Sequence, residues 1–266
     1  MATYSLQLDE AERARYRMMA AHAVQAEGEL WARAGVVPGA AVADVGCGPG
    51  ATLVELARAV GPEGRAVGVE PAAEARQAAR QELDGAGLAA VGVVEGTAGA
   101  TGLEPGAFDC VMVRHVLAHN QPAEVAAALA HLAGLLRPGG HLYVVDTDLD
   151  AFRSSPADPA MEAMAERYSA FHRSLGNDPR IGPQLPALLA GAGLAVVVKR
   201  GEWLALPGVL VRDGGPLRSA QAAMVAAGVA SEAELAGWDS ARHRFADVPG
   251  ATIWAPMFLA VGQRLA

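Results

Sequence analysis

Residues 42–50 read Val42-Ala43-Asp44-Val45-Gly46-Cys47-Gly48-Pro49-Gly50, and this stretch decides the fold of the 266-residue chain. An apolar strand pattern runs directly into three glycines at alternate positions, and a helical apolar pattern begins just after them. Glycine lets the backbone turn sharply and approach a ligand without a Cβ in the way. The helix directs unpaired N–H groups and its positive dipole end at whatever lies over the turn. The stretch therefore predicts a cradle for a nucleotide-type cofactor.

Two classes of cofactor fit this turn. Gly46-x-Gly48-x-x-Ala51 satisfies the dinucleotide fingerprint in its G-x-G-x-x-A form. However, Asp44 stands two residues before the first glycine, where a carboxylate can receive a cationic group, and Gly50 adds a third alternate glycine. At this point the chain resembles the class I methyltransferases that use S-adenosylmethionine (SAM). Their first motif is close to D-x-G-x-G-x-G.

The resemblance is to the small-molecule type of this family, such as the methyltransferases of ubiquinone, menaquinone and natural-product biosynthesis. The sequence Leu136-Arg137-Pro138-Gly139-Gly140 before a fifth strand (141–146) is a second point of resemblance, which extends over residues 36–146. The Asn/Asp-Pro-Pro-Tyr/Phe motif of enzymes that methylate nitrogens of bases and glutamine is missing after the fourth strand pattern (107–113).

An acid at the end of the second strand pattern (65–70) is the next candidate for cofactor binding. Glu70 lies where a carboxylate can accept hydrogen bonds from two ribose hydroxyls. A dinucleotide enzyme would use the same acid, and the alternative is an acid at the start of the helix over 74–83. The resemblance implies an adenine contact at Thr97, where the family often has Asp, and a cofactor carboxylate bound by Arg114 as a bidentate donor. The predicted cofactor-binding residues are Asp44, Gly46, Cys47, Gly48, Gly50, Glu70, Pro71, Thr97, Ala98, Arg114 and Tyr16.

Two helical segments are candidates for covering the site. The helix over 10–31 either packs on the domain edge or, as the resemblance implies, folds over the cofactor with Tyr4, Tyr16 and Arg17 as contacts. The segment 148–180 carries a stripe of Met and aromatic residues, which suits either a core or an adaptable apolar pocket wall. The predicted substrate contacts are Met164, Tyr168, Phe171 and His119. The remaining insertion, 201–256, contains two predicted helices, 217–227 and 231–246.

Whether the acceptor needs a base depends on its chemistry, and the candidates for such a base are His115, His119, His172 and Asp148. His115 and His119 are spaced to share a helical face, but the Glu that a zinc protease places between two histidines is missing. The two cysteines show no zinc-binding spacing. We therefore expect catalysis without a metal.

The composition excludes several partners. The net charge is −8 with no basic run, which argues against nucleic acid or an anionic membrane. The first residues lack a signal-peptide pattern, and glycines and prolines interrupt the longest uncharged run, 181–198. We expect a cytoplasmic protein, monomeric or homodimeric, with a small-molecule partner.

The predicted fold is α/β: a Rossmann-like, doubly wound sheet of seven strands in the order 3-2-1-4-5-7-6, with the last strand antiparallel and a helical cap. Residues 1–34 form the N-terminal part of the cap, 35–147 and 181–266 the SAM-binding core, and 148–180 a lid. The predicted function is SAM-dependent methylation of a small, partly apolar metabolite. One alternative is an NAD(P)-dependent reductase, disfavoured because no Tyr-x-x-x-Lys pair follows the fourth strand. The other is a SAM-binding module without catalysis.

Overall fold

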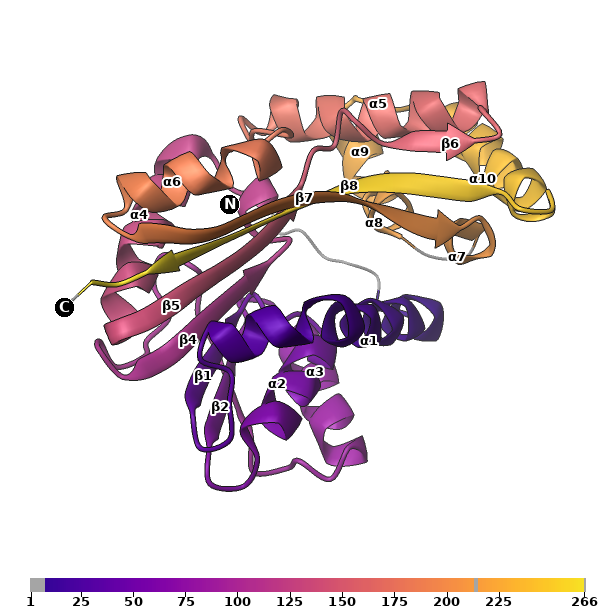
Figure 1. The fold of residues 1–266 in the computed structure, drawn as a ribbon. Coiled ribbons are helices and arrows are strands. Elements are labelled where there is room, and N and C mark those ends of the chain that lie inside the picture. The colour runs from indigo at the N-terminus through magenta and orange to yellow at the C-terminus, as the bar shows by residue number, and fades with distance from the viewer. Residues whose placement is uncertain (1–7, 213–214, 266) are drawn as a thin grey trace.

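A computed structural model describes residues 8–212 and 215–265, so Tyr4 lies outside the described residues. The strands form one sheet in the order β3-β2-β1-β4-β5-β8-β6, and β7 pairs with β8 outside this path (Figure 1). Strands β1 to β5 are parallel, whereas β8 runs antiparallel to β5, β6 and β7. The strands are β1 (Ala41–Val45), β2 (Arg65–Val69), β3 (Gly92–Val94), β4 (Phe108–Arg114), β5 (Leu136–Thr147), β6 (Arg153–Ser155), β7 (Ala195–Pro207) and β8 (Thr252–Gln263).

The predicted sheet has seven strands in the order 3-2-1-4-5-7-6. When the short strand β6 is left aside, β7 and β8 are the sixth and seventh strands, and the predicted order is confirmed. The short strand β6 is an addition that pairs with the outer end of β8. A segment of three residues is too short to show the alternation from which a strand is predicted. β7 and β8 are also longer than expected from the patterns over 194–199 and 257–262, and they pair over their whole length.

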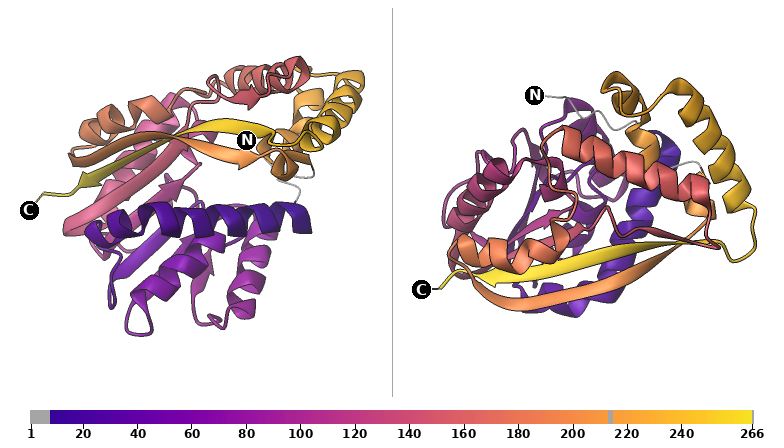
Figure 2. Two further views of the ribbon diagram at one scale, coloured as in Figure 1. Left: turned by 45° about the vertical axis from the view of Figure 1, so that its right-hand side comes forward. Right: turned by 90° about the horizontal axis from the view of Figure 1, so that it is seen from above.

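Helices cover both faces of the sheet, as a doubly wound fold requires (Figures 1 and 2). One face packs against α1 and α2 and the other against α4 and α6. No described helix has the length and apolar character needed to span a membrane. The helices are α1 (Glu10–Arg33), α2 (Ala51–Val60), α3 (Ala73–Gly85), α4 (Pro122–Leu135), α5 (Pro159–Ser174), α6 (Leu185–Gly191), α7 (Val209–Arg212), α8 (Pro216–Ser219), α9 (Gln221–Ala226) and α10 (Glu232–Ala246), with short 3₁₀ turns η1 (Leu117–His119) and η2 (Gly182–Gln184).

The two insertions of the sequence fold into one cap, which consists of β6, α5 and α7 to α10. Met164 and Phe171 from α5 share a buried apolar cluster with Trp238 and Phe245 from α10. The outer halves of β7 and β8 carry this cap beyond the edge of the core (Figure 2). The helix predicted over 217–227 is divided into α8 and α9, whereas the helix predicted over 231–246 is confirmed as α10, which begins with a capping box of Ser231 and Glu234.

The C-terminal half of α1 is anchored to the sheet by a buried acid. Glu27 pairs with both terminal nitrogens of Arg114 at the end of β4, at 2.6 and 3.0 Å. It also accepts hydrogen bonds from Tyr143 Oη at 2.8 Å and Trp31 Nε1 at 3.3 Å. Although burial works against ionisation, Arg114 and these donors hold the pKa of Glu27 below its usual range. One charged side chain therefore fixes α1 against β4 and β5.

The N-terminal half of α1 is held from two sides. Arg17 pairs with Glu82 of α3 at 2.8 Å. The buried Glu12 accepts a hydrogen bond from the backbone N–H of Gly215 in the cap at 2.9 Å. The helix thus bridges the core and the cap, and it does more than pack on the edge of the domain.

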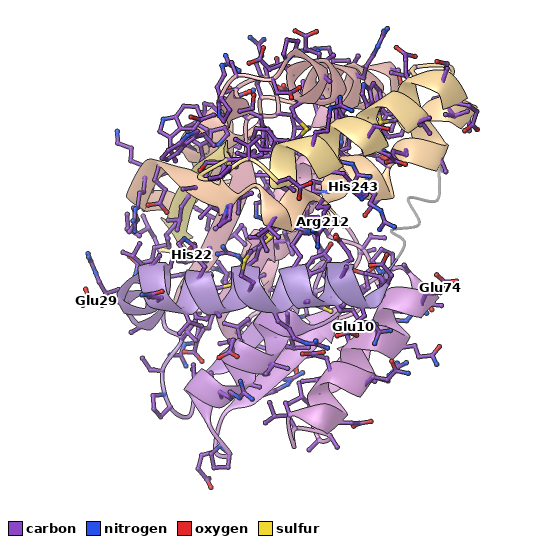
Figure 3. The ribbon with its side chains drawn as sticks, turned by 90° about the vertical axis from the view of Figure 1, so that its right-hand side faces the viewer. Glu10, His22, Glu29, Glu74, Arg212 and His243 are labelled. Atoms are coloured by element: carbon purple, nitrogen blue, oxygen red, sulfur yellow. The ribbon has the colours of Figure 1, made fainter. Side chains whose placement is uncertain are left out.

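Replacing Glu27 with Ala should destabilise the fold strongly, because the guanidinium of Arg114 would remain buried without its partner. The free energy of unfolding should fall by about 3–5 kcal/mol, measured by urea denaturation. Glu29→Ala on the same helix is the control, since Glu29 is exposed at the outer edge of α1 (Figure 3) and should change stability by less than about 0.5 kcal/mol. Equal stabilities of the two variants would contradict the anchoring role of Glu27.

Candidate functional site

The glycine turn (residues 46–50) connects β1 to α2 and uses its three glycines for different purposes. All three have φ between 51° and 87°, a region that side chains rarely adopt. A Cβ on Gly46 would lie 2.3 Å from Val116 Cγ2, and one on Gly50 would lie 2.9 Å from Cα of Ala79. These two glycines allow close packing of the turn. A Cβ on Gly48 would meet nothing nearer than Cε1 of Tyr16, at 4.0 Å, so this position borders open space.

Glu70, just beyond the end of β2, braces the turn from the neighbouring strand. Its Oε2 accepts a hydrogen bond from the N–H of Gly48 at 3.1 Å, and its Oε1 accepts one from the N–H of Ala72 at 2.9 Å. Burial raises the pKa of Glu70, and the two N–H donors oppose that rise. The carboxylate keeps further acceptor positions, because each oxygen has two lone pairs. Glu70 therefore accepts a backbone hydrogen bond at the start of α3, and its remaining lone pairs can accept hydrogen bonds from hydroxyl groups.

Asp44 is a buried acid with one carboxylate oxygen that accepts no hydrogen bond from the described residues. Within residues 8–212 and 215–265, its Oδ2 has no hydrogen-bond partner. Burial raises the pKa of Asp44 to about 7, with the charge of Arg114 lowering it and that of Glu70 raising it. A buried unpaired carboxylate is costly, so the site favours a ligand that brings a cation or a donor.

These features fit a cationic nucleoside such as SAM better than an anionic dinucleotide. Gly48 provides room for the ligand, Glu70 provides acceptors for hydroxyls, and Asp44 provides a partner for a positive group. The pyrophosphate of a dinucleotide would instead meet two acids at the turn. Tyr16 lies over Gly48, so α1 covers this space.

The other predicted cofactor contacts lie around the same strand ends. Thr97 is exposed, and its backbone N–H is bonded to the carbonyl of Ala100 at 3.1 Å, whereas Ala98 is buried. Pro71 is exposed, with its carbonyl bonded to Arg76 Nη1 at 2.6 Å. The buried thiol of Cys47 belongs to the cluster under α2 and α3.

Arg114 has a different partner from the one predicted. Both of its terminal nitrogens are bonded to Glu27, so the guanidinium already binds a carboxylate of the chain itself. A cofactor carboxylate would have to displace Glu27 to gain the same bidentate contact. In this structure Arg114 anchors α1, and its charge acts on Asp44 from that position.

A cluster of aromatic and histidine side chains lies where α5 meets η1. The ring of His172 is 5.0 Å from that of His119 and 4.7 Å from that of Tyr168, and Phe171 packs at 6.0 Å. His172 Nδ1 is 2.9 Å from the carbonyl oxygen of Ala118. Because a carbonyl only accepts, Nδ1 carries the proton and Nε2 keeps its lone pair. The structure thus brings together four of the residues predicted for catalysis and substrate binding.

His172 is held as a neutral imidazole with the lone pair of Nε2 unused. Nε2 has no partner in the described part of the chain, and burial lowers the pKa of the ring. Asp146 supports this arrangement by accepting a hydrogen bond from the N–H of Ala118 at 3.2 Å, which fixes the η1 turn and with it the Ala118 carbonyl. Burial raises the pKa of Asp146 to about 6.

The other three candidate bases, His115, His119 and Asp148, lie in local environments that differ from that of His172. His115 has φ of 56°, an uncommon value for a residue other than glycine, and burial and Arg114 lower its pKa to about 3. Desolvation by the neighbouring side chains and the nearby His172 lower the pKa of His119, although the residue is exposed to solvent. Asp148 accepts a hydrogen bond from the N–H of Asp150 at 3.0 Å in an ordinary turn.

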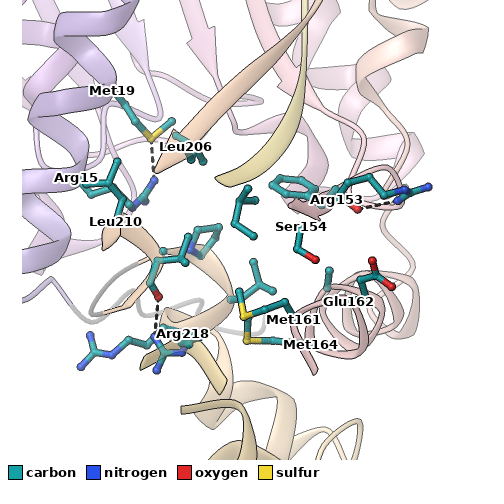
Figure 4. Close-up of a pocket in the computed structure, with 18 of the residues that line it drawn as sticks. Arg15, Met19, Arg153, Ser154, Met161, Glu162, Met164, Leu206, Leu210 and Arg218 are labelled. Atoms are coloured by element: carbon teal, nitrogen blue, oxygen red, sulfur yellow. Dashed lines mark hydrogen bonds between the residues drawn. The ribbon is translucent and has the colours of Figure 1, made fainter. Parts of the chain in front are cut away.

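The predicted substrate contacts on α5 serve as core residues of the cap. Met164, Tyr168 and Phe171 are each at most 4% exposed and share one apolar cluster. The α5 stripe was expected to be either core or pocket wall, and one residue can be both. Met164 is buried in the cap and also borders a cavity between α1 and the cap (Figure 4). Among the residues described, no group of three or more His, Cys, Asp or Glu side chains is placed to hold a metal ion.

Sequence reasoning missed Glu27 as an anchor and Asp146 as a support for η1. Glu27 lies on the buried stripe of α1 between Ala23 and Trp31, and an acid on an apolar stripe is a signal of a buried partner. Asp146 stands near the carboxyl end of β5, where open α/β sheets place their ligands. Both signals were present in the sequence, but their partners are distant along the chain.

Comparison with known proteins places the glycine turn in a known domain. Residues 42–140 match the family model described as a methyltransferase domain. The uncharacterized 37.1 kDa protein of transposon TN4556 from Streptomyces fradiae is 36% identical over 60% of this chain and 44% of its own length. Nocamycin O-methyltransferase of Saccharothrix syringae is 37% identical over 40% of this chain and 37% of its own length. The chain therefore spans less than half the length of these two relatives.

Solved structures support the fold over nearly the whole chain. A putative methyltransferase from Bacillus halodurans C-125 superposes with a TM-score of 0.60 at 15% identity, covering 91% of this chain and 100% of that one. At this level of identity the likeness concerns the fold alone. It extends beyond residues 42–140 to the cap.

The affinity for SAM should rise with pH up to neutrality, because of Asp44. A bound cation favours the ionised carboxylate, so binding below the Asp44 pKa of about 7 must release a proton. The association constant should then increase by up to about tenfold per pH unit between about pH 5.5 and 7. Isothermal titration calorimetry measures this slope, and Asp44→Asn should remove it. The same slope in both proteins would show that Asp44 does not face the cation.

Proposed function

We propose, on the premise that residues 42–140 form a methyltransferase domain of the class I fold, that this protein transfers a methyl group from SAM to a small molecule. The observation that carries the proposal is Asp44 Oδ2, which is buried beside the glycine turn and has no partner among the described residues. A sulfonium or ammonium group supplies the missing charge, whereas the pyrophosphate of a nicotinamide cofactor does not.

Residues from the ends of β1, β2 and β3 and from α1 would hold the cofactor. The backbone of the glycine turn lies against it, with room left by Gly48. Glu70 accepts hydrogen bonds from the ribose, and Asp44 faces the positive end. Tyr16 covers the turn from α1. Thr97 and Ala98 lie at the adenine end, beyond β3.

When bound, SAM supplies a methyl group that is already activated for transfer. The protein therefore has to position the acceptor and exclude water. The cap and α1 serve this purpose, since Glu12 joins them directly through the N–H of Gly215. In this proposal residues 148–180 act as a lid together with α7 to α10, because their side chains share one core.

His172 is the proton acceptor in the proposed reaction. The Ala118 carbonyl holds its Nδ1 proton, so Nε2 is the atom that takes a proton from an acceptor hydroxyl. Its lowered pKa keeps the ring neutral at physiological pH, in the form that can act as a base. Asp146 positions His172 indirectly, by fixing the backbone of η1.

The proposed acceptor is a small, partly apolar molecule with an ionisable hydroxyl. The Saccharothrix syringae relative, which is named as an O-methyltransferase, and the apolar cap support this choice. A SAM-binding module without catalysis is the second candidate function. The burial of His172 Nε2 at η1 favours it, because a base has to contact the acceptor.

Mass spectrometry of incubations with methyl-deuterated SAM tests the proposed function. The protein should transfer the label to at least one hydroxyl-bearing compound in a panel of phenols, enols and natural-product alcohols. Binding of SAM without any labelled product would favour the non-catalytic module. Oxidation of NADH by the same protein would favour the reductase.

Replacing His172 with Asn should keep a donor near Ala118 and remove the lone pair of Nε2. The rate of transfer in a single turnover should fall by about 10²–10⁴-fold, while calorimetry shows unchanged affinity for SAM. His22→Asn serves as the control, because His22 is exposed on α1 (Figure 3). An unchanged rate in the His172 variant would exclude it as the base.

A further inference from the structure

Strand β7 is a long edge strand of the sheet. It has 13 residues and pairs with β8 on one side, while no other described strand pairs with it. Figure 2 shows it along the border of the molecule in the view from above. The edge strand β3, by contrast, has three residues. Because an edge strand presents a row of unpaired N–H and C=O groups, β7 is the place where a further strand can add to the sheet.

Large apolar side chains are exposed beside this edge. On β7 itself, Trp203 is 55% exposed and Val197 is 48% exposed. Trp254 of β8 is 39% exposed, and its partner in the register is Ala205. Side chains two residues apart on a strand share a face, so Trp203 and Trp254 lie on the same face of the two strands. Tryptophan is enriched in protein interfaces, which makes a second polypeptide chain a suitable partner for this edge.

The charges of β7 restrict which strand can pair with it. Its charged residues are Lys199, Arg200 and Glu202. Arg200 pairs with Glu202 of its own chain and donates to the carbonyl oxygen of Ala26 on α1 at 3.3 Å, so both charges lie on the face toward α1. Like charges directly opposite each other destabilise a pair of strands. A matching strand therefore needs an acid opposite Arg200 and a base opposite Glu202.

A second copy of β7 meets this requirement. Two copies that pair antiparallel are related by a two-fold axis perpendicular to the sheet, so residues at equal distances on either side of a central residue lie opposite each other. With Gly201 at the centre, Arg200 of each copy lies opposite Glu202 of the other. A centre at Arg200 or at Glu202 would instead place that residue opposite itself. Gly201 is also the midpoint of β7 (Ala195–Pro207), so the register that matches the charges is the one that pairs the strand over its whole length.

We infer that β7 forms the interface of a homodimer, in which two copies of the chain join edge to edge by antiparallel pairing about Gly201. On the face toward α1, the Arg200 and Glu202 side chains of the two copies alternate in sign around the axis. On the other face, Lys199 of each copy lies opposite Trp203 of the other, where an ammonium group can contact the ring. Backbone hydrogen bonds and the covered tryptophans supply affinity, and the charges select the register and the partner. This inference does not depend on the reaction that the protein catalyses.

Charge reversal on β7 tests the interface. Arg200→Glu places only acids around the axis on this face, and Glu202→Arg places only bases there. Analytical ultracentrifugation over a series of concentrations should show a dimer for the native protein and a dimer dissociation constant at least about tenfold higher for each variant. Arg58→Glu is the matched control, because it makes the same change of charge and breaks an exposed ion pair with Glu55 on α2. It should dimerise as the native protein does.

A mixture of the two β7 variants is the sharper test. In a mixed dimer the acids of Arg200→Glu lie opposite the bases of Glu202→Arg, so every pair across the axis is again of opposite sign. Neither variant alone should form a dimer at the concentration used, whereas their equimolar mixture should form one. Circular dichroism of each variant, compared with the native protein, shows that both are folded before they are mixed.

Three results would overturn the inference. The first is native protein that stays monomeric at every concentration measured. The second is a native dimer that both β7 variants form equally well, which would place the interface on another surface. The third is a mixture of the two folded variants that remains monomeric, which would show that Arg200 and Glu202 of different copies do not lie opposite each other.

Discussion

The backbone of the glycine turn is the constraint on which the rest of the molecule depends. Gly46 and Gly50 have no room for a Cβ, because Val116 and Ala79 pack against them. Those contacts fix the end of β1 against the segment after β4 and set α2 against α3. Gly48 alone borders open space, and Glu70 holds its N–H from the neighbouring strand. The same geometry that closes the core thus leaves one position where a ligand can approach the backbone.

Helix α1 is joined to the sheet and to the cap by two acids. Glu27 neutralises Arg114 inside the core, and Glu12 binds the N–H of Gly215 in the cap. Between them Tyr16 lies over Gly48, with Arg15 stacked beside it. The helix is therefore a structural bridge whose middle turn borders both the cofactor site and the cavity next to Met164.

The core was predictable because its signals are local. The alternate glycines, the acid ending β2 and the amphipathic pattern of α4 each lie within one element, and the family resemblance that these motifs support implied the strand order. The cap was less predictable, because α5 is stabilised by α10 and by β8, far away along the chain. Its Met and aromatic stripe therefore left core and pocket wall undecided, and the structure shows Met164 in both roles.

The sequence did not reveal which residues pair with the charged side chains. The resemblance implied a cofactor carboxylate as the partner of Arg114, whereas the packing of α1 places Glu27 beside it. The tautomer of His172 depends in the same way on the carbonyl of Ala118, which belongs to another element. Such pairs form between distant segments, so periodicity and spacing do not reveal them.

Calorimetry with SAM and NADH on a glycine variant tests whether the turn binds SAM at Gly48. Asn tolerates positive φ, so Gly48→Asn should fold while its side chain fills the space under Tyr16. Gly106→Asn is the matched control, since Gly106 has φ of 69° and an open surround. We expect native protein and the control to bind SAM but not NADH, and Gly48→Asn to bind neither. Unchanged SAM binding by folded Gly48→Asn, or tight NADH binding by native protein, would contradict the claim.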